Sequence, residues 1–197
     1  MPYLCRMKIF ISTLLILTIN RMVLAQDNDR HQRWDVKTRM DTVRLYAKLD
    51  STSVNFQRSL SKPKWSRKNG WAKLPRQEDE KDTLILCGFV VKIGIESDGD
   101  YHLVIADTCS MDSTMTVEIP NPVFCKFPFA EYYLKARFIV DTLWKQPKSK
   151  GHIRSVVCKR VKIKGLGFWD KTHGWKTNDH APNGREIHPV FEVGPCE

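Results

Sequence analysis

The sequence predicts a mainly β domain with one long helix and a polar arm before it. Two observations carry this prediction. Three short β-rich runs separated by turn signals lie between residues 83 and 119, and one amphipathic segment, 127–144, precedes two further strand patterns. The sequence shows no regular alternation of strand and helix patterns, which argues against a doubly wound α/β fold.

The first strand is predicted over residues 83–95, TLILCGFVVKIGI, which are rich in β-branched side chains. Gly88 and Gly94 allow this strand to bulge or bend. Asp98-Gly99 predicts a tight turn, because glycine readily adopts the positive φ that hairpin turns need. The second and third strands are expected at 101–107 and 114–119.

Residues 127–144 predict the helix that follows the third strand. Apolar side chains recur there at helical intervals, and Phe127, Leu134 and Phe138 share one side. Two more strands are expected at 152–164 and 187–193. Three meandering strands, a helix and two further strands is the order of a five-stranded OB-like barrel, which is the fold we expect.

The first 25 residues predict a signal peptide. Arg6 and Lys8 precede an apolar run, Ile9 to Ile19, and the segment ends at the small residue Ala25. This run of 11 residues is too short to span a bilayer, which takes about 20. We therefore expect an exported protein, periplasmic or extracellular, with no transmembrane segment after cleavage.

Residues 26–80 are polar, basic and poor in periodic apolar positions. They predict an irregular N-terminal arm and linker, with at most a short helix near 43–49. The barrel domain is expected to occupy residues 81–197.

The charge of the predicted mature chain is basic. Without Arg6, Lys8 and Arg21 it has 29 basic and 22 acidic residues, a net charge of +7. Residues 144–164 contain eight lysines and arginines and no acid. This run indicates a polyanion partner, either nucleic acid or an anionic glycan. The alternative is a solvated strand face whose lysines protect a sheet edge.

The predicted mature chain contains an odd number of cysteines. An exported chain can form disulfides, so one or two pairs are expected, and at least one thiol stays free or pairs with another molecule. No pair has C-x-x-C spacing, which argues against a zinc–thiolate site. The connectivity is open among Cys87, Cys109, Cys125, Cys158 and Cys196.

The long connection between the last two strands, residues 169–186, is a candidate site, because long connections in compact domains are often functional. A second candidate is Asp100 with His102, which share a face if a strand begins at Asp100. Imidazole and carboxylate groups together suit a divalent metal, the one candidate cofactor, or acid–base chemistry. The alternative is a hairpin turn with hydrogen-bonded histidines. The candidate metal ligands are Asp100, His102, His173, Glu186 and His188.

A ligand-binding site is also predicted from aromatic and basic residues. OB domains bind oligonucleotides and oligosaccharides with stacking aromatic rings and basic grooves. Trp169 and Trp175 are the candidate stacking platforms, and Arg160, Lys162 and Lys164 the candidate phosphate partners.

Four segments resemble a group of exported bacterial proteins of unassigned function: ESDGDYHLVIAD, MTVEIPNP, KIKGLGFWDKTHG and HAPNGREIHPVFEV. The resemblance covers residues 82–193 and extends weakly to RWDVKTRMD, 33–41. The chain has Trp169 where the group usually has a second Phe, and Arg185 where Ile is common. Residues that match the group's motifs include Asp100, His102, Glu118, Asp170, His173, Glu186 and His188.

The resemblance implies an exported OB-like domain and brings no activity with it. Three functions therefore remain open. The first is a ligand-binding module for nucleic acid or another polyanion, and the second is a non-catalytic envelope accessory protein. The third is a metal-dependent hydrolase that acts on a phosphodiester or a similar substrate. The sequence leaves the ligand and the oligomeric state open.

Overall fold

The computed structural model describes residues 33–42, 44–45, 48–64, 74–145, 151–171 and 179–196. The predicted signal peptide lies outside these ranges, as do His173 and Trp175. Among the described residues, no helix is long and apolar enough to cross a membrane.

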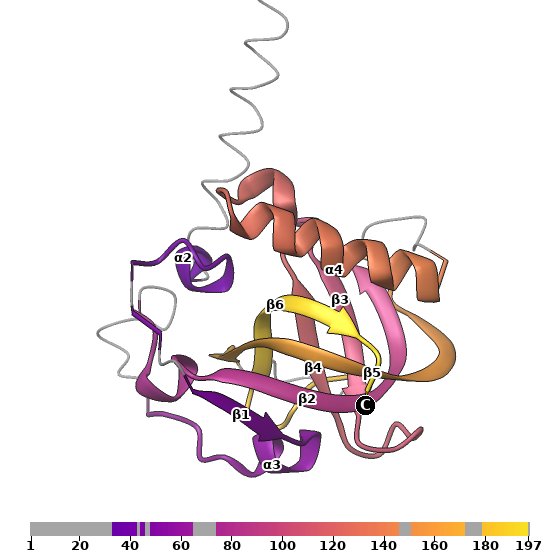
Figure 1. Cartoon of the computed structure of the whole chain (residues 1–197). Helices are drawn as coiled ribbons and strands as arrows, with labels where there is room; N and C mark the ends of the chain where they lie inside the picture. Colours follow the sequence, from indigo (N-terminus) through magenta and orange to yellow (C-terminus); the bar gives the residue numbers. More distant parts are fainter. Residues whose placement is uncertain are drawn as a thin grey trace, which may run out of the picture.

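Six strands form one sheet, so the prediction of a mainly β fold with one main helix is confirmed (Figure 1). Neighbouring strands follow the order β1-β2-β3-β4-β6-β5, and β2 also pairs with β5, so the pairing returns to β2. The strands are β1 (Leu49–Thr52), β2 (Thr83–Ile95), β3 (Tyr101–Ala106), β4 (Thr114–Ile119), β5 (Arg154–Trp169) and β6 (Arg185–Gly194).

The predicted count of five strands is wrong, because β1 arises within the segment predicted as an irregular arm. Strand β3 pairs with β2 only from Phe89 to Ile95. The same edge of β2 is therefore available over Thr83–Leu86, and β1 pairs with it there in parallel. The backbone N–H and C=O groups at this edge of β2 need hydrogen-bond partners. The side-chain pattern of β1 alone does not reveal that its backbone supplies them.

The predicted bend in β2 occurs between the two glycines. The register of β2 shifts between Val90 and Lys92, which marks a bulge. Gly88 allows β2 and β3 to approach closely, because a Cβ atom there would lie 2.9 Å from the carbonyl oxygen of Ala106.

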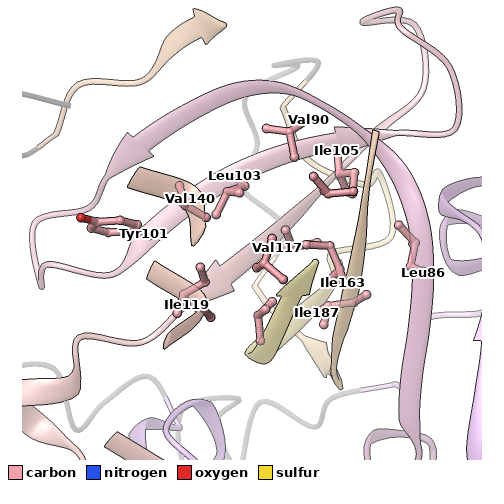
Figure 2. Packing of buried hydrophobic residues seen from close by; sticks show 14 of the residues in the cluster. Leu86, Val90, Tyr101, Leu103, Ile105, Val117, Ile119, Val140, Ile163 and Ile187 are labelled. Carbon is pink, nitrogen blue, oxygen red and sulfur yellow. The ribbon is translucent and has the colours of Figure 1, made fainter. Parts of the chain in front are cut away.

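The hydrophobic core lies between the strands of the sheet and helix α4 (Phe129–Leu143) (Figure 2). Alternate side chains of β3 and β4 point into it, as Leu103 and Ile105 do from β3 and Val117 and Ile119 from β4. The opposite faces of β3 and β4 are buried as well. Polar side chains lie on these opposite faces, including His102, Thr116 and Glu118.

Helix α4 (Phe129–Leu143) lies across one end of the sheet (Figure 1). Its core-facing side chains are Tyr133, Ala136 and Val140, and the Tyr133 ring stacks on Phe191 with centroids 6.3 Å apart. The side shared by Phe127, Leu134 and Phe138 is the exposed one. The tyrosine, alanine and valine recur at i, i+3 and i+7, which is an equally regular helical stripe.

The described part of residues 26–80 packs against the sheet. Two short helices, α2 (Trp34–Lys37) and α3 (Val54–Ser59), bury Trp34, Lys37 and Val54. Of the helix expected near 43–49, residues 43, 46 and 47 lie outside the described ranges, and Leu49 begins β1. The 3₁₀ turn η3 (Glu78–Glu80) connects this segment to β2, and a second, η4 (Pro122–Phe124), precedes α4.

Two disulfides form, which is the upper end of the predicted number. Cys87 pairs with Cys196, and Cys109 pairs with Cys158. Cys125 is the free thiol among the described cysteines.

Candidate metal centre

Strands β3 and β4 place His102 opposite Glu118. The two residues are Cα partners in the antiparallel pairing, so their side chains project from the same face. His102 Nδ1 lies 2.9 Å from Glu118 Oε1 in a hydrogen bond, and 3.3 Å from Glu96 Oε1. The histidine therefore lies between the buried carboxylate of Glu118 and the carboxylate of Glu96, whose side chain is 37% exposed.

Strand β6 adds His188 to this face. Val117 of β4 pairs in parallel with Ile187 of β6, and both point into the core. The next residues, Glu118 and His188, therefore meet on the opposite face. His188 Nδ1 lies 2.9 Å from Glu118 Oε2.

Asp100 completes the group from the turn before β3. Its Oδ2 lies 3.3 Å from His188 Nε2, and its Oδ1 accepts a hydrogen bond of 2.7 Å from Asn121 N. The turn depends on Gly99, which has a φ of 92°. A Cβ atom there would also lie 2.6 Å from Asn121 Nδ2.

Four buried atoms of this group lack a hydrogen-bond partner. They are Asp100 Oδ2, His102 Nε2 and the two ring nitrogens of His188. Carboxylate oxygens lie close to both nitrogens of His188, but not in directions that form hydrogen bonds. An unsatisfied buried polar atom costs about 1–3 kcal/mol. Unsatisfied carboxylate and imidazole atoms buried side by side indicate a site for a cation.

Asp100, Glu118 and His188 can each offer one ligand atom, and these atoms lie within 4.8 Å of one another. Each carboxylate has one oxygen held by a hydrogen-bond donor, from Asn121 N or His102 Nδ1, and its other oxygen directed to His188. Such outer-shell contacts orient ligands in metal sites. A second set, Glu96, His102 and Glu118, shares Glu118 with the first.

Charge stabilises the contact between His188 and Glu118. Burial disfavours the charged imidazolium, yet the nearby Glu118 and Asp100 carboxylates hold the pKa of His188 above its ordinary value. Burial likewise opposes ionisation of Glu118, but His188 and the hydrogen bond from His102 hold its pKa well below the ordinary value. Both shifts favour a protonated His188 beside an ionised Glu118.

Lys37 and Glu186 lie beside this group. Burial and the neighbouring Asp170 and Glu118 raise the pKa of Glu186 well above its ordinary value. Burial tends to lower the pKa of Lys37, but Glu118, Asp170, Glu186 and Asp100 outweigh it, and the net shift is upward. The site thus contains a lysine that stays charged and a carboxyl group that favours its protonated form.

The structure brings three of the five predicted metal ligands together: Asp100, His102 and His188. Glu186 lies on the same face, two residues before His188 in β6. His173 lies outside the described residues.

The prediction missed Glu118, Glu96 and Lys37 as members of the cluster. Glu118 did carry a signal, because it is polar within the apolar strand MTVEI and matches a motif of the resembled group.

The predicted ligand-binding residues occupy two different environments. Trp169 is fully buried, its Nε1 donates to Asp79 Oδ2, and the guanidinium of Arg185 lies 4.7 Å from its ring centroid. No face of that ring is exposed for stacking, and Trp175 lies outside the described residues.

The three basic residues lie on the outer face of β5, where they alternate with the core residues Val161 and Ile163. Arg160 is exposed, and Lys162 and Lys164 are half-buried. Lys162 Nζ lies 3.1 Å from Glu192 Oε1.

No family model matches this chain, and no curated protein matches it. One solved structure that matches is described as "OBody AM3L09 bound to hen egg-white lysozyme". Its TM-score is 0.36 at 16% sequence identity, and the match covers 69% of this chain and 95% of that chain. This similarity is too low to carry an argument about fold or function.

Proposed function

We propose that this chain is a metal-binding protein whose centre consists of Asp100, Glu118 and His188. One observation carries the proposal: Asp100 Oδ2 and the His188 ring nitrogens are buried without hydrogen bonds, next to Glu118 Oε2. A divalent cation bound by one oxygen each of Asp100 and Glu118 and by one ring nitrogen of His188 satisfies three of these atoms at once.

The ligand set selects the class of metal. Two carboxylates and one imidazole form a mixed oxygen and nitrogen set, which suits Zn²⁺ and similar transition metals better than Ca²⁺ or Mg²⁺. Three protein ligands leave one position of a tetrahedral ion for water, as in catalytic zinc sites. The enzymatic form of the proposal is therefore a metal-dependent hydrolase.

The wider setting that we propose is an exported OB-like barrel. The cyclic strand order β2-β3-β4-β6-β5, with the helix between β4 and β5, supports this fold. Two disulfides support an oxidising compartment, because such bonds are rare in the cytosol.

Titration of chelator-treated protein with Zn²⁺ by calorimetry, with the bound metal measured after gel filtration, tests the proposal. We expect one tightly bound ion per chain, and a loss of affinity of a hundredfold or more in Asp100→Asn and His188→Ala. Glu192→Gln is the matched control, because that carboxylate lies exposed on the outer face of β6. A folded wild-type protein that binds no ion contradicts the proposal.

Polyanion binding along β5 is the second candidate function. It is favoured by Arg160, Lys162 and Lys164, which share the outer face of a strand whose inner face is core. Binding of labelled single-stranded DNA is expected to weaken steeply with salt, since each phosphate contact releases counterions. Arg160→Ala with Lys164→Ala is expected to reduce this salt slope, and Lys126→Ala, an exposed lysine before α4, is expected to leave it unchanged. Binding that does not change with salt argues against this function.

A further inference from the structure

Lys37 places a fixed positive charge next to the candidate metal centre. It is the last residue of α2 and is 7% exposed. Its Nζ lies 5.5 Å from the centroid of the Phe168 ring. That ring in turn lies 5.6 Å from the ring of His188. Phe168 thus connects the lysine to one of the candidate ligands.

The strand register places this lysine on the polar face of the sheet. Phe168 of β5 is the Cα partner of Glu186 in β6, so the two side chains share a face. His188 follows two residues later and lies on that face as well. Lys37 therefore covers the face on which the candidate ligands converge.

The Lys37 ammonium faces several carboxylates without pairing to any one of them. In the described part of the chain it forms no ion pair or hydrogen bond. Electrostatic attraction nevertheless links it to Glu118, Asp170, Glu186 and Asp100, and Glu96 also interacts with it. The charge therefore acts on members of both candidate ligand sets.

Neighbouring contacts fix the position of α2. Arg33, which precedes the helix, forms two hydrogen bonds with Glu80, of 2.8 and 2.5 Å, and both side chains are fully buried. On the other side, the Tyr133 hydroxyl donates to the carbonyl oxygen of Thr38 at 3.0 Å. Both ends of α2 are therefore held, which fixes the backbone position of Lys37.

We propose that Lys37 is an internal cation that takes the place of a second divalent ion and limits the centre to one. This inference rests on the proposed metal-binding function. The two ligand sets share Glu118, so the geometry offers two adjacent ion positions. Carboxylate-rich sites of this kind can hold two ions about 3.5–4 Å apart. A buried ammonium that acts on both sets repels the second ion and offsets the carboxylate charge that would attract it.

The stoichiometry of Zn²⁺ binding tests this proposal. Wild-type protein is expected to bind one ion, and Lys37→Met is expected to bind two. The affinity of Lys37→Met for the second ion is expected to be at least tenfold higher than that of the wild-type protein. Lys37→Arg keeps the charge and is expected to bind one. The double variant Lys37→Met, Glu96→Gln is expected to return to one, because Glu96 belongs only to the second set.

Two outcomes overturn the inference: a wild-type protein that binds two ions, or a folded Lys37→Met that binds one with unchanged affinity. Lys37→Gln carries the same test if the methionine variant does not fold, since it removes the charge and keeps a polar side chain. A folded wild-type protein that binds no ion instead overturns the proposed function. The two failures are therefore distinguishable.

Discussion

Arg185 lies with its guanidinium 4.7 Å from the ring centroid of Trp169, and the two residues are Cα partners across β5 and β6. Gly167 completes the arrangement, because a Cβ atom there would lie 2.0 Å from Arg185 Nη2. Trp169 and Arg185 are therefore a matched pair whose side chains pack together.

The matched pair predicts coupling between two substitutions. Arg185→Ile removes the donors to Gln57 Oε1 and to the carbonyl oxygen of Asp79, which costs about 1–3 kcal/mol of unfolding free energy. In the background of Trp169→Phe we expect a cost smaller by about 1 kcal/mol, because part of the cation–π interaction is already lost. Urea unfolding of the two single variants and the double variant measures the difference. Strictly additive effects would contradict the coupling.

The buried pair of Arg33 and Glu80 predicts a large loss of stability on substitution. Arg33→Met leaves the Glu80 carboxylate buried with only its contacts to the backbone N–H groups of Gln77 and Trp169. We expect a cost of about 3 kcal/mol, as for other buried ion pairs that lose one partner. Lys81→Met is the control, because its partner Glu78 is largely exposed and such pairs contribute less than about 1 kcal/mol. Equal costs for both substitutions in chemical denaturation would count against the prediction.

Stability of the metal-free protein should depend on pH. Burial opposes protonation of His102 and His188, but the carboxylates around them raise both pKa values above 6.5. Their contribution is therefore complete below about pH 6.5 and is lost as the pH rises through the raised values. Burial opposes ionisation of Glu118, but His188 lowers its pKa well below 4.5, so its contribution is lost only as the pH falls through that lowered value.

We therefore expect the free energy of unfolding of chelator-treated protein to be higher near pH 6 than near pH 9. The decrease should be smaller in His188→Gln, which cannot take up the proton. Urea titrations at several pH values measure it. An unchanged free energy between pH 6 and pH 9 would show that these histidines are not protonated in the fold.

Cys125 is predicted to react slowly in the folded protein. Burial and the nearby Asp100 carboxylate raise its pKa from 9.0 to about 12. At pH 8 the thiolate fraction is then about a thousandfold lower than for the unfolded chain, and the thiolate is the reactive form. Iodoacetamide labelling of residues 26–197 followed by mass spectrometry should show one modified cysteine, Cys125, in denaturant without reductant. Rapid labelling of the native protein would contradict the prediction.

The two sides of α4 should respond differently to truncation. Val140 is buried in the core, and Val140→Ala is expected to cost about 2 kcal/mol through the cavity it leaves. Phe138 is 68% exposed, so Phe138→Ala is expected to change the unfolding free energy by less than about 0.5 kcal/mol. Thermal unfolding of the two variants distinguishes them, and a larger effect of Phe138→Ala would mean that another molecule covers its side of the helix.

Strands β2, β3 and β4 could be predicted because their patterns and turns are local. Strand β1 could not, because LDST has no strand pattern and pairs only where β3 leaves the edge of β2 free. Asp100 and His102 were predicted to share a face because that relation needs only strand alternation. Their link to Glu118 depends on the register of two strands, and the position of Lys37 depends on how a separate segment packs. Neither can be read from spacing along the chain.

The candidate centre draws its residues from distant parts of the chain, from Asp100 before β3 to His188 in β6. Contacts between such distant residues form late in folding, because the intervening chain must first be ordered. An ion that needs all of them finds no site in the unfolded chain or in an early intermediate. It should therefore leave the rate of folding unchanged and slow the rate of unfolding. For this protein, the metal would bind after folding and stabilise the folded state kinetically.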